Sequence, residues 1–133
     1  MNELENIKEK KLGEMKKNLE ASKIQTEIEV NDSNFDEEVL KKSKTVAVAV
    51  DFWATWCTPC LMLSPTLKKF AKEYKGKFVL AKLNVDENPV TSSKHEISGI
   101  PAVKMFKNSQ VVDEFVGALP EPAVKHWLDK NLQ

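Results

Sequence analysis

The residues best suited to chemistry in this 133-residue chain are its only two cysteines, Cys57 and Cys60, which Thr58 and Pro59 separate. An apolar run at 46–54 precedes the pair, and a helical pattern follows it. Two thiols where a strand turns into a helix can alternate between dithiol and disulfide. The first amides of a helix lack internal partners, and its positive dipole end favours an anion. We therefore expect Cys57 to react as a thiolate.

The residues after the pair predict different surroundings for the two sulfurs. One apolar stripe at helical spacing contains Cys60, Leu63, Leu67, Phe70 and Tyr74. Cys60 is therefore expected on the buried face and Cys57 at an exposed helix start, so that Cys57 attacks and Cys60 resolves. Pro59 suits the first helical turn, where a missing N–H costs little.

Three other uses of the cysteine pair have to be weighed. A zinc site needs four ligands, and only His95 and His126, expected on helix surfaces far from the pair, could add to the two thiols. A purely structural disulfide is disfavoured, because closing so short a loop constrains the unfolded chain little and so stabilises the fold little. Two unpaired core cysteines are the third alternative, against which the exposed helix start argues. We expect no metal and no cofactor beyond the redox-active disulfide.

The composition favours a single cytoplasmic domain. Lys and Arg number 20 and Asp and Glu also 20, so net charge gives no reason to expect binding to nucleic acid or to an anionic membrane. No apolar run is long enough to span a bilayer, and the N-terminus alternates Lys and Glu without the apolar centre of a signal peptide. We expect a reducing compartment, where a Cys-x-x-Cys pair is more often catalytic than structural.

Helix and strand patterns alternate along the chain and predict an α/β sheet with a hairpin at one edge. The predicted strands are residues 26–30, 45–52, 78–85, 102–106 and 111–116. Helices are predicted at residues 3–20, 57–75 and 89–96. Another helix is predicted with Phe35, Val39 and Leu40 inward, and Asp32, Ser33 or Asn34 would cap it. The last predicted helix starts at Pro122 and has Val124, Trp127 and Leu128 inward.

Four separated stretches, in the same order, resemble the thioredoxin family. They are VDFWATWCTPC at 50–60, KLNVDENP at 82–89, GIP at 99–101 and VGAL at 116–119. A Cys-x-x-Cys within a βαβ pattern is an established signature of this family. The resemblance implies a thioredoxin fold, a central mixed sheet flanked by helices, for residues 24–133. Residues 1–23 are left as an N-terminal helical extension that packs on the domain, protrudes, or binds a partner or second copy.

The resemblance implies a role for each matched residue. Cys57 corresponds to the attacking thiol and Cys60 to the resolving thiol, with Asp51 as the buried carboxylate behind them and Lys82 as its amine neighbour. Residues implied in substrate binding are Trp56, Pro59, Gly99, Ile100, Pro101, Gly117 and Ala118, with Pro101 as the family's cis-proline and the Ile100 backbone pairing with the substrate.

Physical arguments bear on three of these roles. A carboxylate inside an apolar strand is costly to ionise, so the pKa of Asp51 should rise, and such a group can exchange a proton with Cys60 near neutrality. The alternatives are an Asp51 turned outward at a strand end, a Lys82 on the plain surface, and a trans Ile100–Pro101 bond.

The chain departs from the common family pattern at three positions. Thr58 replaces the usual glycine between the cysteines, which leaves the redox potential open. Ala102 replaces the threonine after the cis-proline, and Ser109 replaces the glycine of the last hairpin, so that the turn type is also open. None of these changes removes a reacting group.

The predicted function is general cytosolic reduction of protein disulfides by dithiol–disulfide exchange. The implied partners are disulfide-containing target proteins and thioredoxin reductase, or an equivalent reductase, to recharge the pair. One alternative is an exported protein of the same kind. Another is a disulfide oxidase or isomerase, which often has His where this chain has Pro59. The last is a non-enzymatic subunit that recognises partners.

Overall fold

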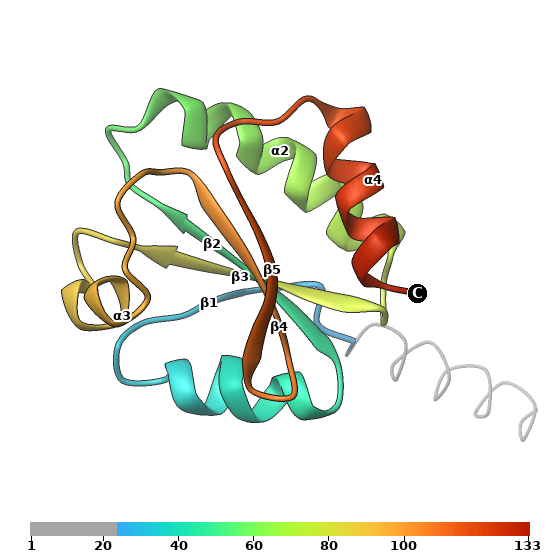
Figure 1. Ribbon diagram of the computed structural model, residues 1–133, viewed down its shortest axis with the longest axis horizontal. Helices are drawn as coiled ribbons and strands as arrows, with labels where there is room; N and C mark the ends of the chain where they lie inside the picture. Colours follow the sequence, from blue (N-terminus) through green and yellow to red (C-terminus); the bar gives the residue numbers. More distant parts are fainter. Residues whose placement is uncertain (1–23) are drawn as a thin grey trace, which may run out of the picture.

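A single five-stranded sheet forms the centre of the protein in the computed structural model, which describes residues 24–133 (Figure 1). Its strand order is β1-β3-β2-β4-β5. Strands β1, β3 and β2 are parallel, whereas β4 runs antiparallel to β2, and β5 antiparallel to β4. The strands are β1 (Glu27–Glu29), β2 (Ala47–Trp53), β3 (Phe78–Asn84), β4 (Ala102–Lys107) and β5 (Gln110–Val116).

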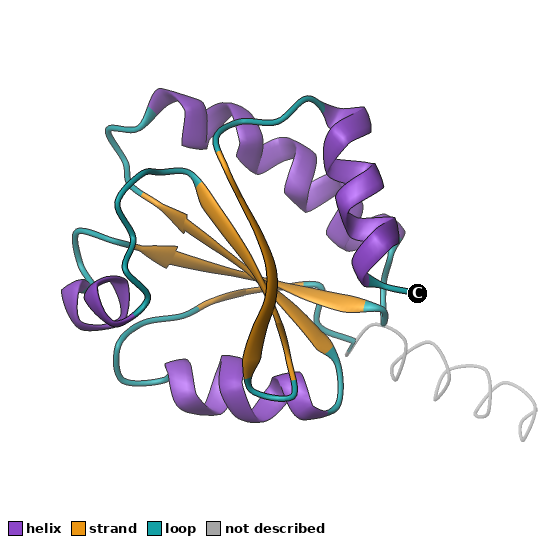
Figure 2. Cartoon of the chain, viewed as in Figure 1, coloured by secondary structure: helices purple, strands orange, loops and turns teal. Residues whose placement is uncertain are grey.

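Helices cover both faces of this sheet (Figure 2). Helices α2 and α4 pack on one face, and the η1–η2 segment and α3 lie on the other. Their bounds are η1 (Asp36–Lys41), η2 (Lys42–Lys44), α2 (Thr58–Glu73), α3 (Pro89–Lys94) and α4 (Glu121–Asn131). The predicted mixed sheet flanked by helices is confirmed, whereas the predicted helix at 3–20 lies outside the described residues. None of the helices described has the length and apolar character that crossing a membrane requires.

The alternation of side chains along β2 divides the core in two. Ala49 packs with the apolar stripe of α2 and α4, whereas Val50 and Phe52 pack with Phe35 and Val39 beneath η1. Successive strand residues point to opposite faces, so Asp51 points toward the α2 side of the sheet. The same alternation on β3 turns Lys82 toward that side, where its Nζ donates a hydrogen bond to Ser64 of α2.

The cap of the first helical segment differs from the prediction. The Asn31 carboxamide oxygen accepts hydrogen bonds from the backbone N–H groups of Ser33 and Asn34, which forms the turn before η1. The Asp32 carboxylate instead accepts from the N–H groups of Val90 and Thr91 at the start of α3. Asp32 therefore caps a helix far away in sequence, because the fold brings that helix end beside it.

The hairpin between β4 and β5 has a turn with positive φ at both central residues, 51° at Asn108 and 67° at Ser109. Two such residues are typical of a type I′ turn, which normally favours glycine. The Ser109 N–H donates to Ser43 Oγ, and Ser109 Oγ donates to the Leu40 carbonyl. These hydrogen bonds to the η1–η2 segment offset the cost of serine in this conformation.

Candidate active site

The two cysteines lie where the carboxyl end of β2 passes into the first turn of α2, and they form a disulfide with a Cα–Cα distance of 5.3 Å. Cys57 is the N-cap residue of α2, with extended backbone angles of φ −89° and ψ 100°. Its N–H donates to the Ala54 carbonyl at 3.2 Å, which closes the turn out of the strand. The strand end and the helix start therefore fix the position of the pair.

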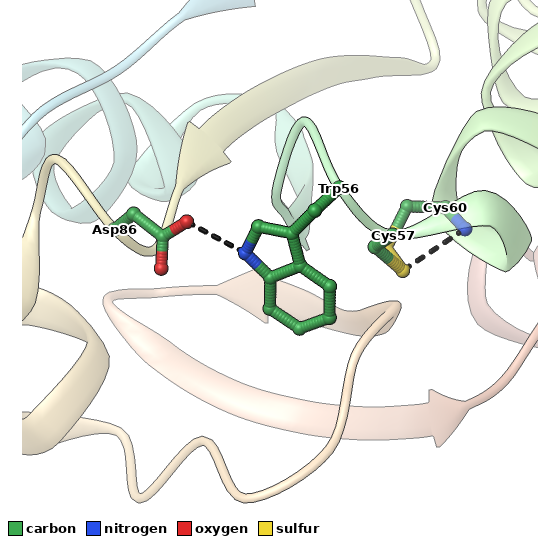
Figure 3. The surroundings of a disulfide bond; sticks show 4 residues. All are labelled: Trp56, Cys57, Cys60 and Asp86. Atoms are coloured by element: carbon green, nitrogen blue, oxygen red, sulfur yellow. Dashed lines mark hydrogen bonds between the residues drawn. A yellow bond between two sulfur atoms is a disulfide. The ribbon is translucent and has the colours of Figure 1, made fainter.

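The Cys57 sulfur takes the place of a capping oxygen at the helix N-terminus. The backbone N–H of Cys60 donates to Cys57 Sγ at 3.2 Å (Figure 3). A helix start has free N–H donors and a positive dipole end, and both stabilise a negative charge at this sulfur. When the disulfide is reduced, this geometry favours the thiolate of Cys57 over that of Cys60, and the thiolate is the nucleophile.

Both cysteines are buried, which corrects the prediction that Cys57 is exposed. Cys57 is 3% exposed and Cys60 1% exposed. The two residues form a small apolar cluster with Ala54, on which the side chains of Val85 and Ile100 pack. The sequence pattern indicated only which face of α2 is apolar, whereas Val85 and Ile100, which bury Cys57, come from neighbouring loops. The difference between the two sulfurs therefore lies in position along the helix rather than in residue exposure.

We predict that Cys57 is alkylated before Cys60 in the reduced protein, because its sulfur sits at the helix end and accepts the Cys60 N–H. Brief iodoacetamide treatment followed by peptide mass spectrometry measures the order. Labelling after unfolding in denaturant, where both thiols should react alike, is the control. Equal labelling of the folded protein, or labelling led by Cys60, would contradict the assignment of the attacking thiol.

Trp56, directly before the disulfide, is 67% exposed, and its indole Nε1 donates to Asp86 Oδ2 at 2.8 Å (Figure 3). Asp86 comes from the loop after β3, so the hydrogen bond joins two segments distant in the sequence. It limits the motion of a large exposed ring. Asp86 was not singled out from the sequence, although it lies within the matched stretch at 82–89.

A second loop brings most of the predicted substrate-binding residues together. The Ile100–Pro101 bond is cis, and the Gly117 N–H donates to the Pro101 carbonyl at 2.8 Å. A Cβ added to Gly99 would lie 3.5 Å from Val116 Cγ1, so these two segments are in close contact. Gly117 has φ +100°, a conformation that side chains disfavour.

Three residues complete the placement of the predicted binding set. Ile100 packs on the cysteine cluster, which connects the cis-proline loop to the disulfide. Ala118 is exposed immediately after the Gly117 hydrogen bond, and Pro59 is exposed between the cysteines. The fold therefore gathers the loops around 56–60, 99–101 and 116–118, although their contact with a substrate stays a prediction.

Asp51 is only 1% exposed, and within residues 24–133 neither of its carboxylate oxygens has a hydrogen-bond partner. Burial raises its pKa to about 7, while the positive charge of Lys82 partly opposes that rise. The two residues pair in register across β2 and β3. The alternative of an outward-facing Asp51 is therefore wrong, and the predicted rise in its pKa agrees with the buried position.

Lys82 is a half-buried residue rather than a plain surface lysine. Its Nζ donates to Ser64 Oγ at 2.9 Å and lies 4.7 Å from the centre of the Trp53 ring. An ammonium over an indole face is held by the ring's negative quadrupole. Lys82 thus stands near Asp51 without forming an ion pair with it among the described contacts. Ser64 lies on the helix face toward the sheet, a partner that the sequence did not reveal.

His95 corrects a further expectation, because it is not a simple surface residue. Its ring lies 5.2 Å from that of Phe35, 6.1 Å from Phe52 and 5.5 Å from Phe106. Burial lowers the pKa of His95, and the charge of Lys104 adds to this effect. His126 is exposed, as expected. Within residues 24–133, no group of three or more His, Cys, Asp or Glu side chains is placed to hold a metal.

Comparison with known proteins agrees with this geometry. The family model described as "Thioredoxin" matches residues 26–130. A thioredoxin of Chlorobaculum thiosulfatiphilum is 45% identical over 104 residues, which cover 78% of this chain and 94% of that protein. A thioredoxin of Staphylococcus haemolyticus is 46% identical over 105 residues, covering 79% and 97% respectively. With its buried Cys-x-x-Cys pair at a helix start, the chain belongs to the thioredoxin family of thiol–disulfide oxidoreductases.

Proposed function

We propose that this protein is a general reductase of protein disulfides in the cytoplasm, with Cys57 as the attacking thiol and Cys60 as the resolving thiol. The observation that carries this assignment of roles is the capping geometry, in which Cys57 Sγ accepts the helix N–H of Cys60. Because Cys57 is the thiol more readily ionised, it attacks the target disulfide first. Cys60 lies beside it and is therefore placed to displace the target from the mixed disulfide in an intramolecular second step.

Each turnover transfers two electrons from the cysteine pair to the target. The Cys57 thiolate attacks one sulfur of the target disulfide, forming a mixed disulfide while the other target sulfur leaves as a thiolate. Cys60 then loses its proton and attacks Cys57 Sγ, so the Cys57–Cys60 disulfide forms and the second target sulfur leaves. Protonation of the two target thiolates completes their reduction.

The buried carboxylate suits the proton transfer of the second step. Asp51 has a pKa of about 7, so near neutrality it is able to accept a proton and to give one up. Both Asp51 and Cys60 lie on the α2 side of the sheet, where Cys60 belongs to the buried stripe of the helix. We assign Asp51 to deprotonation of Cys60, with Lys82 keeping the carboxylate within a useful pKa range.

The loops beside the disulfide suit an extended segment of the target protein. The backbone of Ile100 would pair with that segment in the manner of an added strand. The remaining contacts would come from small or apolar groups at Trp56, Pro59, Gly99, Pro101, Gly117 and Ala118.

Membership of the family implies a reductase that recharges the oxidised protein, and we propose an enzyme of the thioredoxin reductase kind. Disulfide-containing proteins are the targets that the family implies. No cofactor is needed for the exchange itself, because the cysteine pair carries the electrons. We propose that residues 24–133 are the catalytic domain and that residues 1–23 are an appendage to it.

The redox potential distinguishes a reductase from an oxidase or isomerase on the same fold. The established reference values are about −270 mV for thioredoxin and about −180 mV for protein disulfide isomerase. We expect this protein within some tens of millivolts of the former, because Pro59 occupies the position where the oxidising proteins often carry His. Equilibration with defined ratios of reduced and oxidised glutathione measures the potential. A value near that of the isomerase would reject the reductase assignment.

A further inference from the structure

The sequence on both sides of the disulfide is uncharged, from β2 well into α2. No charged residue occurs between Asp51 and Lys68, although 30% of the whole chain is charged. Within this stretch, Leu61 is 53% exposed and Met62 is 68% exposed. Both follow Cys60 directly, so two large apolar side chains stand in solvent within one helical turn of the reactive pair.

Among the described residues, neither of these two side chains belongs to the apolar core. Leu63 and Leu67 supply the buried face of α2, and Leu61 and Met62 lie outside all three apolar clusters of the described residues. Leu61 is one helical turn beyond Cys57, and its N–H donates to the Cys57 carbonyl at 3.2 Å. Exposed apolar groups gathered at a reactive centre are typical of contact with a partner.

We propose that Leu61 and Met62 bind an apolar segment of the protein substrate, next to the disulfide that Cys57 attacks. The covalent chemistry sets the location, because a mixed disulfide ties the target to Cys57 and so brings its neighbouring chain against the first turns of α2. Cysteines are among the most buried residues of folded proteins, so the residues near a target disulfide are often apolar. Because residues 52–67 include no charged residue, an apolar segment that binds along this stretch would not strip water from a charge within it.

This contact would favour protein substrates over small disulfides. A small disulfide reaches Cys57 without covering Leu61 or Met62, whereas a protein target covers both. The inference deepens the disulfide exchange proposed above and depends on it. It adds a specificity determinant on α2 that is separate from the cis-proline loop, and it involves no change in the chemical step.

The test compares Leu61→Gln, Met62→Gln and the double variant with the parent, using the full chain. Glutamine is uncharged, so the electrostatic field at Cys57 is preserved while the apolar contact is lost. For insulin, kcat/KM should fall about tenfold in the double variant, equivalent to about 1.4 kcal/mol. For bis(hydroxyethyl) disulfide, which does not span the two residues, the rate should stay within about twofold.

Val112→Gln is the matched control, because Val112 is likewise an exposed apolar residue, with 50% of its surface accessible. It lies on β5 toward the hairpin turn, at the opposite end of the strand from Val116, which contacts the cis-proline loop. This variant should leave both rates unchanged. An unchanged insulin rate in the double variant would overturn the proposal, and so would an equal loss with both disulfides, which would indicate damage to the chemistry. A parent that sediments as a dimer and becomes monomeric in the double variant would also overturn it, because a second copy would then cover the surface. Failure of the parent itself to reduce either disulfide would instead reject the proposed function.

Discussion

Replacing Cys60 by serine should stop turnover after the first step and leave the protein covalently bound to its target. Cys57 still forms the mixed disulfide, but no thiol remains beside it to displace the target. The reduced Cys60→Ser protein, mixed with insulin, should therefore yield a stable complex on a non-reducing gel that dithiothreitol releases. Steady-state reduction of insulin should fall to the uncatalysed background.

The reciprocal variant, Cys57→Ser, serves as the control for this prediction. It should form almost no complex and also reduce no insulin, because its remaining thiol, Cys60, lacks the capping position at the helix start. If Cys57→Ser trapped the target as well as Cys60→Ser does, the two thiols would have exchangeable roles. The direction of attack inferred from the helix N-terminus would then be wrong.

Asp51→Asn should make the folded protein more stable relative to the parent as the pH rises from 4 to 8. The pKa of Asp51 is raised from 3.8 to about 7 by burial. At pH 4 the carboxyl is protonated in the folded chain and about half ionised in the unfolded chain, so the ionisation penalty is small there, and it vanishes at lower pH. Above that pH the unfolded chain releases the proton first, and stability is lost progressively until the folded carboxyl ionises near pH 7.

The size of this effect follows from the difference between the ordinary pKa of 3.8 and the folded pKa of about 7. At about 1.36 kcal/mol for each pKa unit, the ionised carboxylate costs on the order of 4 kcal/mol at pH 8. Asparagine removes that cost but buries an amide at a position where no described residue hydrogen-bonds to Asp51, which costs about 1–3 kcal/mol at any pH. The change between the two pH values is therefore a firmer prediction than the stability at either one.

Denaturant unfolding at pH 4 and pH 8 measures this difference, and Asp36→Asn, at an exposed carboxyl on η1, is the control. Single-turnover kinetics should also show slower release of the mixed disulfide in Asp51→Asn, because Cys60 loses its proton acceptor. A stability difference that does not change with pH would mean that the buried carboxylate is not raised in pKa. Unchanged release kinetics would remove Asp51 from the proton transfer while leaving its energetic role intact.

Local patterns in the sequence were enough to predict the order of the described elements and the position of the cysteine pair. The nearly continuous apolar run at 45–52 predicts a central strand, helical spacing from Cys60 to Tyr74 predicts a helix, and the junction lies between them. The lone carboxylate of Asp51 within an apolar strand likewise signalled a raised pKa, because its apolar neighbours in sequence become its neighbours in the core.

The meeting of distant segments, in contrast, depends on the tertiary structure. Cys57 is covered because Val85 and Ile100 come from other loops, and His95 is half-buried because three aromatic rings from other elements converge on it. Asp32 caps α3 rather than its own segment for the same reason. Periodicity reports which face of an element is apolar, but burial and hydrogen-bond partners depend on what the chain folds against that face.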